Sequence, residues 1–369
     1  MDRSDIQMSS TISLKGVKKL FERHAVIEDL NLQLKDGEFL SLLGPSGAGK
    51  TTILRMIAGL EYPDGGEIRI KSRDVSTVPP NKRNLGMVFQ QYALFPHMTV
   101  WENVAYGLKA RKLKKEMIKE KANKYLALTG LSELASRKPR ELSGGQQQRV
   151  SLARALAIEP LVMLFDEPLS NLDARLKDQM LQEIHQLHQK LKFTAVYVTH
   201  DQNEALFLSD KIAVLNGGKI EQFDRPEMIL SQPATAFVAD FFGYTNTFAS
   251  AILKDEHMVS ISGVELPVGY TTETPGSSGI VKMRENGVNI VGNEEASGLE
   301  PSKAEKSIEA YVIEARYLGS ETKLLLRLDQ EGEHSFSVKI PQIIRPLPEI
   351  HSKINLLINA DYVTFYLEE

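Results

Sequence analysis

The sequence contains no cysteine, which excludes disulfide bonds, thiolate metal sites and a cysteine nucleophile. It also lacks a long apolar run: a stretch such as LVMLF (161–165) is far shorter than the roughly 20 residues that a membrane-spanning helix requires. The opening segment, MDRSDIQMSS, is polar and has no apolar stretch of the kind found in secretory signals. We therefore expect a protein of a reducing compartment that contacts a membrane only through partners.

The chain also lacks a large net charge of either sign. The formal net charge of −4 gives no general attraction to nucleic acid or to an anionic membrane. With 42% hydrophobic and 25% charged residues, the composition is that of a soluble globular protein. A chain of 369 residues is longer than a typical single domain, so we expect two domains.

Residues 1–242 alternate strand-like apolar runs with helical patterns, which predicts an α/β domain with a mostly parallel sheet. Runs that end near Leu43, Phe165 and Thr199 are expected to be core strands. Each is followed by polar residues or glycine, and ligands of such sheets bind beyond the carboxyl ends of the strands.

Other segments predict the remaining organisation. Residues 91–160 are expected to form a helical subdomain, because much of this segment has helical spacing and no strand-like run. Asn216-Gly217 predicts a tight hairpin. Residues 243–369 change to short alternating runs, which predict a small all-β domain, barrel-like or sandwich-like, with an exposed loop at 292–307.

The segment GPSGAGKT (44–51) follows an apolar strand and precedes a helix with one apolar face, and it fits the phosphate-loop pattern G-x-x-x-x-G-K-[ST]. Glycines let backbone N–H groups close around phosphate oxygens, and a helix N-terminus favours negative charge. Lys50 is predicted to reach the β- and γ-phosphates and the Thr51 hydroxyl to hold Mg²⁺. An ordinary glycine-rich turn with a solvated lysine is the alternative. The candidate nucleotide-binding residues here are Gly44, Pro45, Ser46, Gly47, Ala48, Gly49, Lys50, Thr51 and Thr52.

Two acidic residues, Asp166 and Glu167, directly follow the strand-like run LVMLF. One carboxylate of such a pair can organise Mg²⁺ while the other polarises an attacking water. Two acids in a loop are usually only solvated, so this assignment depends on the phosphate loop. His200 follows another strand-like run and can hydrogen-bond a γ-phosphate, although a lone histidine is often a structural residue.

The segment ELSGGQQQRVSLARALAIEP (141–160) distinguishes this chain from other phosphate-loop proteins. It places a serine hydroxyl and bare backbone N–H groups at a helix start, which makes a second anion site. The segment resembles the signature sequence of ATP-binding cassette (ABC) proteins, and the other motifs occur in the order of that family. The resemblance covers nearly the whole chain and implies that Ser143, Gly144, Gly145 and Gln146 contact nucleotide.

Matching motif positions imply further roles. Phe21 corresponds to the aromatic that stacks on adenine, with a half-buried strand residue as the plainer interpretation. Gln90 corresponds to the glutamine that senses Mg²⁺ and γ-phosphate, Asp173 lies in a segment like the D-loop, and His200 corresponds to the switch histidine. The family implies a head-to-tail dimer in which each ATP lies between one subunit's phosphate loop and the other's signature segment.

The segments YALFPHMTVWENVAYGL and PLSNLDARL, followed by a β-rich region, resemble the ATPase subunits of bacterial importers for polyamines, ferric iron, sulfate, phosphonates and maltose. The implied fold is an α/β P-loop NTPase of the ABC type plus a C-terminal OB-like regulatory domain. Residues 284–286, Arg-Glu-Asn, depart from the Arg-Pro-Glu common in this group, so no regulatory contact is assigned there. The segment YLGSETKLLLRL (317–328) favours polyamine or ferric iron as the solute over sulfate, phosphonate or sugar.

The resulting hypothesis is a homodimeric ATPase at the cytoplasmic face of a membrane, which drives permease subunits docked near the Gln90 loop and works indirectly with a solute-binding protein. Glu167 would be the general base, with Lys50, Gln90 and His200 as further catalytic residues and Thr51, Gln90 and Asp166 at Mg²⁺. One alternative is a soluble ABC protein acting on DNA or ribosomes, although such proteins usually have two cassettes or a long coiled coil. A second alternative makes the C-terminal domain a sensor of a small anion or a regulatory protein.

Overall fold

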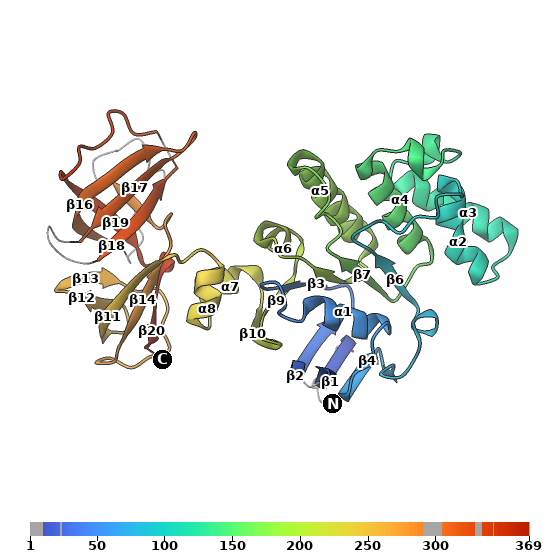
Figure 1. The fold of residues 1–369 in the computed structure, drawn as a ribbon, viewed down its shortest axis with the longest axis horizontal. Coiled ribbons are helices and arrows are strands. Elements are labelled where there is room, and N and C mark those ends of the chain that lie inside the picture. The colour runs from blue at the N-terminus through green and yellow to red at the C-terminus, as the bar shows by residue number, and fades with distance from the viewer. Residues whose placement is uncertain (1–9, 23, 291–304, 329–333, 342, 369) are drawn as a thin grey trace, which may run out of the picture. The chain divides into compact units, whose positions relative to one another are not determined.

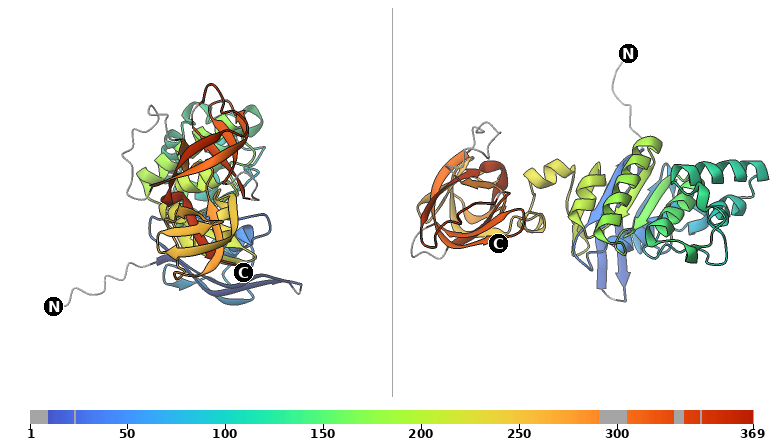
Figure 2. Two further views of the ribbon diagram at one scale, coloured as in Figure 1. Left: turned by 90° about the vertical axis from the view of Figure 1, so that its left-hand side faces the viewer. Right: turned by 90° about the horizontal axis from the view of Figure 1, so that it is seen from above.

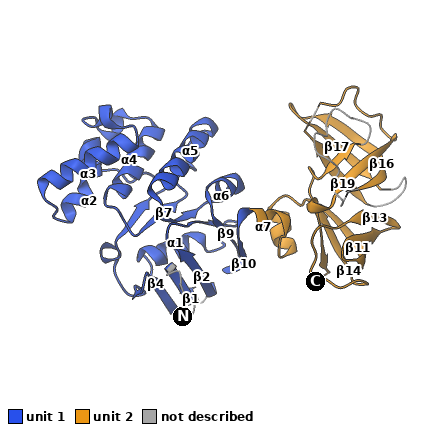
Figure 3. Ribbon diagram, turned by 180° about the vertical axis from the view of Figure 1, so that it is seen from behind, with its two compact units in different colours: residues 1–226 blue, residues 227–369 orange. Residues whose placement is uncertain are grey.

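The computed structural model describes residues 10–22, 24–290, 305–328, 334–341 and 343–368. The chain divides into two compact units, residues 1–226 (unit 1) and 227–369 (unit 2), which Figure 3 colours separately. Within the described ranges, no helix is both long and apolar enough to cross a bilayer.

Two sheets organise unit 1, and Figure 1 shows their strands. The strands are β1 (Ser10–Phe21), β2 (His24–Lys35), β3 (Phe39–Leu43), β4 (Gly65–Ile70), β5 (Arg73–Asp74), β6 (Leu85–Val88), β7 (Val162–Asp166), β8 (Thr194–Val198), β9 (Lys211–Asn216) and β10 (Lys219–Asp224). The larger sheet has the order β10-β9-β3-β8-β7-β6. Its strands pair in parallel from β9 to β6, and only β10 is antiparallel. The smaller sheet, β2-β1-β4-β5, is antiparallel.

The predicted core strands are confirmed as β3, β7 and β8, and they are buried on both faces. Leu40 and Leu42 pack in one core with Ile53 and the apolar side chains of the small sheet. Phe39 and Phe165 pack in a second core on the opposite face. Because strands of a covered parallel sheet are apolar on both sides, they appear in the sequence as continuous apolar runs.

Helices cover the two faces of the larger sheet unequally. They are α1 (Lys50–Ala58), α2 (Val100–Ala110), α3 (Lys115–Leu128), α4 (Gly144–Ala157), α5 (Ala174–Leu191) and α6 (Gln202–Leu208). Helix α1 lies in the core between the two sheets, whereas α2 to α5 contribute to the core on the other face. Helices α2, α3 and α4 pack against one another, and Figures 1 and 2 show them grouped beside β6. Residues 89–161, all described, hold these helices and no strand.

The predicted hairpin joins β9 to β10, but its loop lies one residue later than expected. Asn216 pairs with Lys219 as the last residue pair of the strands, so Gly217 and Gly218 form the turn. Their φ angles are +51° and +79°. A two-residue loop that matches strand twist requires positive φ at both positions, which two glycines adopt without strain.

Unit 2 contains two five-stranded sheets around one apolar core. The strands are β11 (Asn246–Asp255), β12 (Met258–Ile261), β13 (Val264–Pro267), β14 (Ser278–Met283), β15 (Val288–Ile290), β16 (Glu305–Tyr317), β17 (Thr322–Arg327), β18 (Ser335–Ile340), β19 (Lys353–Asn359) and β20 (Val363–Leu367). The sheet orders are β13-β12-β11-β14-β20 and β15-β19-β16-β17-β18. The β-rich character is confirmed, and the likeness to OB domains stays a prediction.

The expected loop at 292–307 lies outside the described residues up to 304, and its last residues belong instead to β16. Two short helices precede the strands of unit 2, α7 (Pro226–Ser231) and α8 (Ala236–Phe241). Lys282 of β14 donates to Asp240 Oδ1 of α8 at 2.6 Å, and the Tyr244 hydroxyl donates to the Leu230 carbonyl at 2.7 Å. These bonds group both helices with the β-rich unit, whereas the sequence pattern changes only after residue 242.

Glu285 lies in the segment where the sequence departs from Arg-Pro-Glu. Its side chain is 14% exposed and makes ion pairs with Lys323 and Lys339, each with 2.9 Å between nitrogen and oxygen. Burial alone would raise the pKa of this carboxyl, but the hydrogen bonds from the two lysines outweigh burial and lower the pKa. Glu285 therefore joins the end of β14 to β17 and β18.

We predict that Glu285→Gln destabilises unit 2 by about 1 kcal/mol near neutral pH, because both charge-assisted bonds are lost at partly exposed lysines. A lowered carboxyl pKa provides stability that is present above the ordinary Glu pKa of about 4.3 and is lost as the pH falls through the folded-state value. The gap in Tm between the two proteins should therefore narrow below about pH 4. Calorimetry of the full chain at several pH values checks this, and equal Tm values at pH 7 would contradict it.

Candidate functional site

The phosphate loop joins β3 to α1 and depends on three glycines. Gly44, Gly47 and Gly49 have φ angles of +153°, +83° and +96°, which residues with a Cβ rarely adopt. A Cβ on Gly49 would also lie 2.6 Å from Ile27 Cδ1. Gly49 is the N-cap of α1 and makes no side-chain capping bond. The first turn of α1 therefore has backbone N–H groups without intrahelical partners, as an anion-binding helix start requires.

A cavity of about 540 Å³ opens at this loop. It combines the loop with side chains that follow β7 and β8, because parallel strands end at the same edge of the sheet. Its lining residues are Phe21, Val26, Ser46, Gly47, Ala48, Gly49, Lys50, Thr51, Thr52, Glu167 and His200. Val26 was not predicted; it lies near the start of β2, whose first residue, His24, pairs with Phe21 at the end of β1. Its closeness in sequence to Phe21 is the signal that could have found it.

Lys50 is held inside the loop. Its ammonium group donates to the Gly44 carbonyl at 2.7 Å and to the Pro45 carbonyl at 2.9 Å, and the residue is 6% exposed. Burial lowers the pKa of Lys50, and the nearby Glu167 carboxylate opposes this shift. Gly44 and Pro45, which were predicted to contact nucleotide, therefore orient the lysine and are not among the residues that line the cavity.

Glu167 and His200 lie close together in the lining of the cavity. His200 Nδ1 lies 3.8 Å from Glu167 Oε2, and the His200 side chain is 64% exposed. Glu167 has a φ of +44°, and its N–H donates to the Val198 carbonyl at 3.1 Å. A left-handed conformation outside glycine costs about 1 kcal/mol or more, and such strain is often found at functional sites.

Asp166 ends β7 and is not among the cavity's lining residues. Burial raises the pKa of the Asp166 carboxyl; Arg55 opposes this rise and Glu167 adds to it. A nearby cation would oppose the effect of burial by stabilising the ionised carboxylate.

Gln90 follows β6 and also lies outside the cavity lining. Its side-chain amide donates to Ser170 Oγ at 3.1 Å, and the Asn171 side chain donates to the Gln90 carbonyl at 3.0 Å. Gln90 is thus bonded to the segment that follows Glu167.

The signature segment forms a separate surface. Ser143 is the N-cap of α4, where its hydroxyl accepts from the Gln146 N–H and its N–H donates to Gln146 Oε1 at 3.0 Å. Ser143, Gly145 and Gln146 line a second cavity, of about 180 Å³, together with side chains at the start of α5. Asp173 caps α5 by accepting from the Leu176 N–H at 3.0 Å. The predicted residues therefore fall into two groups within one chain.

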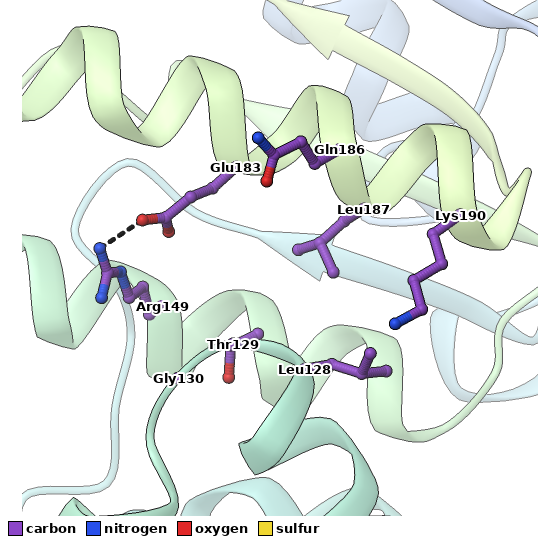
Figure 4. Close-up of a pocket in the computed structure, with 8 residues that line it drawn as sticks. All are labelled: Leu128, Thr129, Gly130, Arg149, Glu183, Gln186, Leu187 and Lys190. Atoms are coloured by element: carbon purple, nitrogen blue, oxygen red, sulfur yellow. Dashed lines mark hydrogen bonds and ion pairs between the residues drawn. The ribbon is translucent and has the colours of Figure 1, made fainter.

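The helices of the signature surface are joined by an ion pair. Arg149 of α4 and Glu183 of α5 point toward one another in Figure 4 and form a salt bridge. Burial raises the pKa of Glu183, and Arg149 opposes that rise. The pair borders a further cavity of about 300 Å³, at whose rim Lys190 stands near the end of α5 (Figure 4). This ion pair therefore links α5 to the helix that carries Ser143.

Comparison with known proteins identifies the family. The ABC transporter family profile matches residues 27–170. The Fe(3+) ions import ATP-binding protein FbpC of Rhizobium etli is 50% identical over 257 residues, which cover 69% of this chain and 73% of the relative. This chain belongs to the ABC transporter family.

Other ABC relatives extend the match. The spermidine/putrescine import ATP-binding protein PotA of Trichormus variabilis is 43% identical over 324 residues, covering 86% of this chain and 84% of the relative. A solved dimer of the ATP-binding cassette MJ0796 bound to ADP and Pi is 35% identical with a TM-score of 0.51, covering 58% of this chain and 98% of that chain. The prediction of an ABC-type importer ATPase subunit is thereby confirmed.

We predict that Gly49→Ala destabilises the nucleotide-free protein by about 2–4 kcal/mol, because a positive φ costs about 1 kcal/mol or more and the added methyl overlaps Ile27. Gly47→Ala is the matched control, since its φ is also positive but a Cβ there meets no atom within 4 Å. Gly47→Ala should be destabilised by only about 1–2 kcal/mol, which is the cost of backbone strain without a steric overlap. Thermal unfolding of both variants checks the difference, and equal losses would contradict the steric explanation.

Proposed function

We propose that this chain, an ATP-hydrolysing subunit of an ABC importer, works as a homodimer that binds two ATP molecules between its copies. The observation that carries this proposal is the separation of the two groups of site residues. Lys50, Glu167 and His200 line the larger cavity, whereas Ser143 and Gln146 line the smaller one. A second copy in head-to-tail arrangement would bring its Ser143–Gln146 segment to the triphosphate held by the first. The solved relative described as dimeric supports this arrangement.

The larger cavity fits a nucleoside triphosphate. Its uncapped helix start and glycine loop offer N–H groups to phosphate oxygens, and Lys50 can exchange two neutral carbonyl acceptors for charged phosphate oxygens. Phe21 is 42% exposed at the cavity and offers an aromatic face on which adenine can stack.

The residues near the cavity also fit Mg²⁺. The Thr51 hydroxyl, the Asp166 carboxylate and the Gln90 amide supply the oxygen donors that this hard cation prefers, in part through its water shell. When bound, the cation would supply positive charge that offsets the negative charge of the phosphates. A cation there would stabilise the ionised Asp166 carboxylate, whose pKa burial raises.

Within the dimer, Glu167 acts as general base and accepts a proton from the attacking water. His200 and Lys50 donate hydrogen bonds to the γ-phosphate and stabilise the charge on it. Gln90, bonded to Ser170 and Asn171, links the γ-phosphate to the loop that follows Glu167. Loss of the γ-phosphate removes the group that both copies contact, so the dimer opens.

We further propose that the dimer docks on integral-membrane permeases at the cytoplasmic face, near the Gln90 loop and α2, with a solute-binding protein as an indirect partner. Ferric iron and polyamines are the preferred solutes. A relative named for sn-glycerol-3-phosphate import is nevertheless 53% identical over 260 residues, so sequence identity does not separate the solute classes. Uptake of labelled ferric iron, spermidine and glycerol phosphate into cells with and without this chain tests the choice.

We predict that Glu167→Gln lowers the ATPase kcat by about 10² to 10⁴-fold while ATP binding is retained, since only the proton acceptor is lost. The variant should form a dimer in MgATP, measured by light scattering. Glu120→Gln, at an exposed position of α3, is the control and should keep the wild-type rate. Normal turnover of Glu167→Gln would remove Glu167 from its role, and a strictly monomeric ATP-bound chain would contradict the shared site.

A further inference from the structure

A buried polar cluster beside His200 joins α5, β8 and α6. Glu204 of α6 is 3% exposed. Its Oε2 accepts from the Tyr197 and Thr199 hydroxyls, each at 2.7 Å, and its Oε1 lies 2.7 Å from Lys177 Nζ. A carboxylate this deeply buried requires a paired cation and satisfied oxygens, and the cluster supplies both.

The same cluster holds both neighbours of His200. The Asp201 N–H donates to Thr199 Oγ1 at 2.9 Å, which closes a tight turn around the histidine. Asp201 Oδ1 accepts from the Asn203 N–H at 2.8 Å and caps α6, while Asp201 Oδ2 accepts from Lys177 Nζ. The backbone on either side of His200 therefore positions its exposed imidazole. Lys177 holds this backbone in place through the carboxylates of Asp201 and Glu204.

Lys177 also belongs to the first turn of α5. Its N–H donates to the Asp173 carbonyl at 2.9 Å. Burial lowers the pKa of Lys177, but the bonds to Asp201 and Glu204 outweigh burial and raise the pKa, so the side chain stays a cation.

We propose that Lys177 is a positioning residue for ATP hydrolysis: through Asp201 and Glu204 it fixes His200 relative to α5 and to Asp173 at its start. This inference rests on the proposed function of His200. Lys177 is not among the residues that line the nucleotide cavity. Its loss should therefore lower kcat and leave the KM for ATP nearly unchanged.

The first test is Lys177→Met in the full chain, with Lys177→Gln as the replacement if the methionine variant does not fold. We expect kcat to fall by about 10- to 100-fold, as a displacement of a catalytic group on the scale of 1 Å can cause. KM should stay within about twofold, since no nucleotide contact is removed. Lys177→Arg keeps the charge and should recover most of kcat, whereas Lys190→Met, at the exposed end of α5 (Figure 4), should not change it.

A double-mutant cycle separates positioning from general damage. In a His200→Ala background, Lys177→Met should lower kcat no further, because both changes remove the same interaction. An equal further loss in that background, or wild-type kcat in Lys177→Met alone, would overturn the proposal.

Hydrogen exchange of the nucleotide-free chain gives a readout that does not depend on turnover. The amides of Asn203 and Glu204, capped by Asp201, should exchange faster in Lys177→Met than in the wild type or in Lys190→Met. A wild-type chain without ATPase activity would refute the proposed function, while unchanged exchange at these amides would refute the positioning role of Lys177.

Discussion

The parallel register of β3, β8 and β7 is the constraint on which the site depends. Val198 of β8 pairs with Leu42 of β3 on one side and with Asp166 of β7 on the other. The phosphate loop, the acidic pair and His200 therefore leave the sheet at the same level, although the phosphate loop lies more than a hundred residues before the other two in the sequence. A shift of one strand by one residue would exchange its two buried faces and move its loop away from the others.

That register is maintained because both faces of the sheet are apolar and covered. Helix α1 lies between the two sheets, so the start of the helix is held at the sheet edge by packing along its whole length. The loop before α1 then adopts positive φ angles that only glycine tolerates well, and the buried Lys50 ammonium stays close to the Glu167 carboxylate. Packing therefore holds backbone N–H groups and charged side chains close together at this loop. Such an arrangement is unfavourable unless a ligand pairs with these groups.

The second group of residues, at the start of α4, is held in place by bonds within this chain. The capping box of Ser143 and Gln146 satisfies the start of α4, and the Arg149–Glu183 pair ties that helix to α5. Through Lys177, α5 is bonded in turn to the loop that carries His200. Helix α5 consequently connects the signature surface to the larger cavity of the same chain.

Local patterns were enough to predict the phosphate loop, the acidic pair, the capped signature helix, the core strands and the β-rich second unit. Each of these depends on backbone preferences and burial over a few adjacent residues, which the order of residues specifies directly. The hairpin turn shifted by one residue because cross-strand pairing of Asn216, rather than its turn preference, sets the end of β9. The bond of Gln90 to Ser170, the Lys177 cluster and the two lysines on Glu285 join residues far apart in the chain. Which distant side chains meet follows from how the helices pack on the sheets, and no short stretch of sequence contains that information.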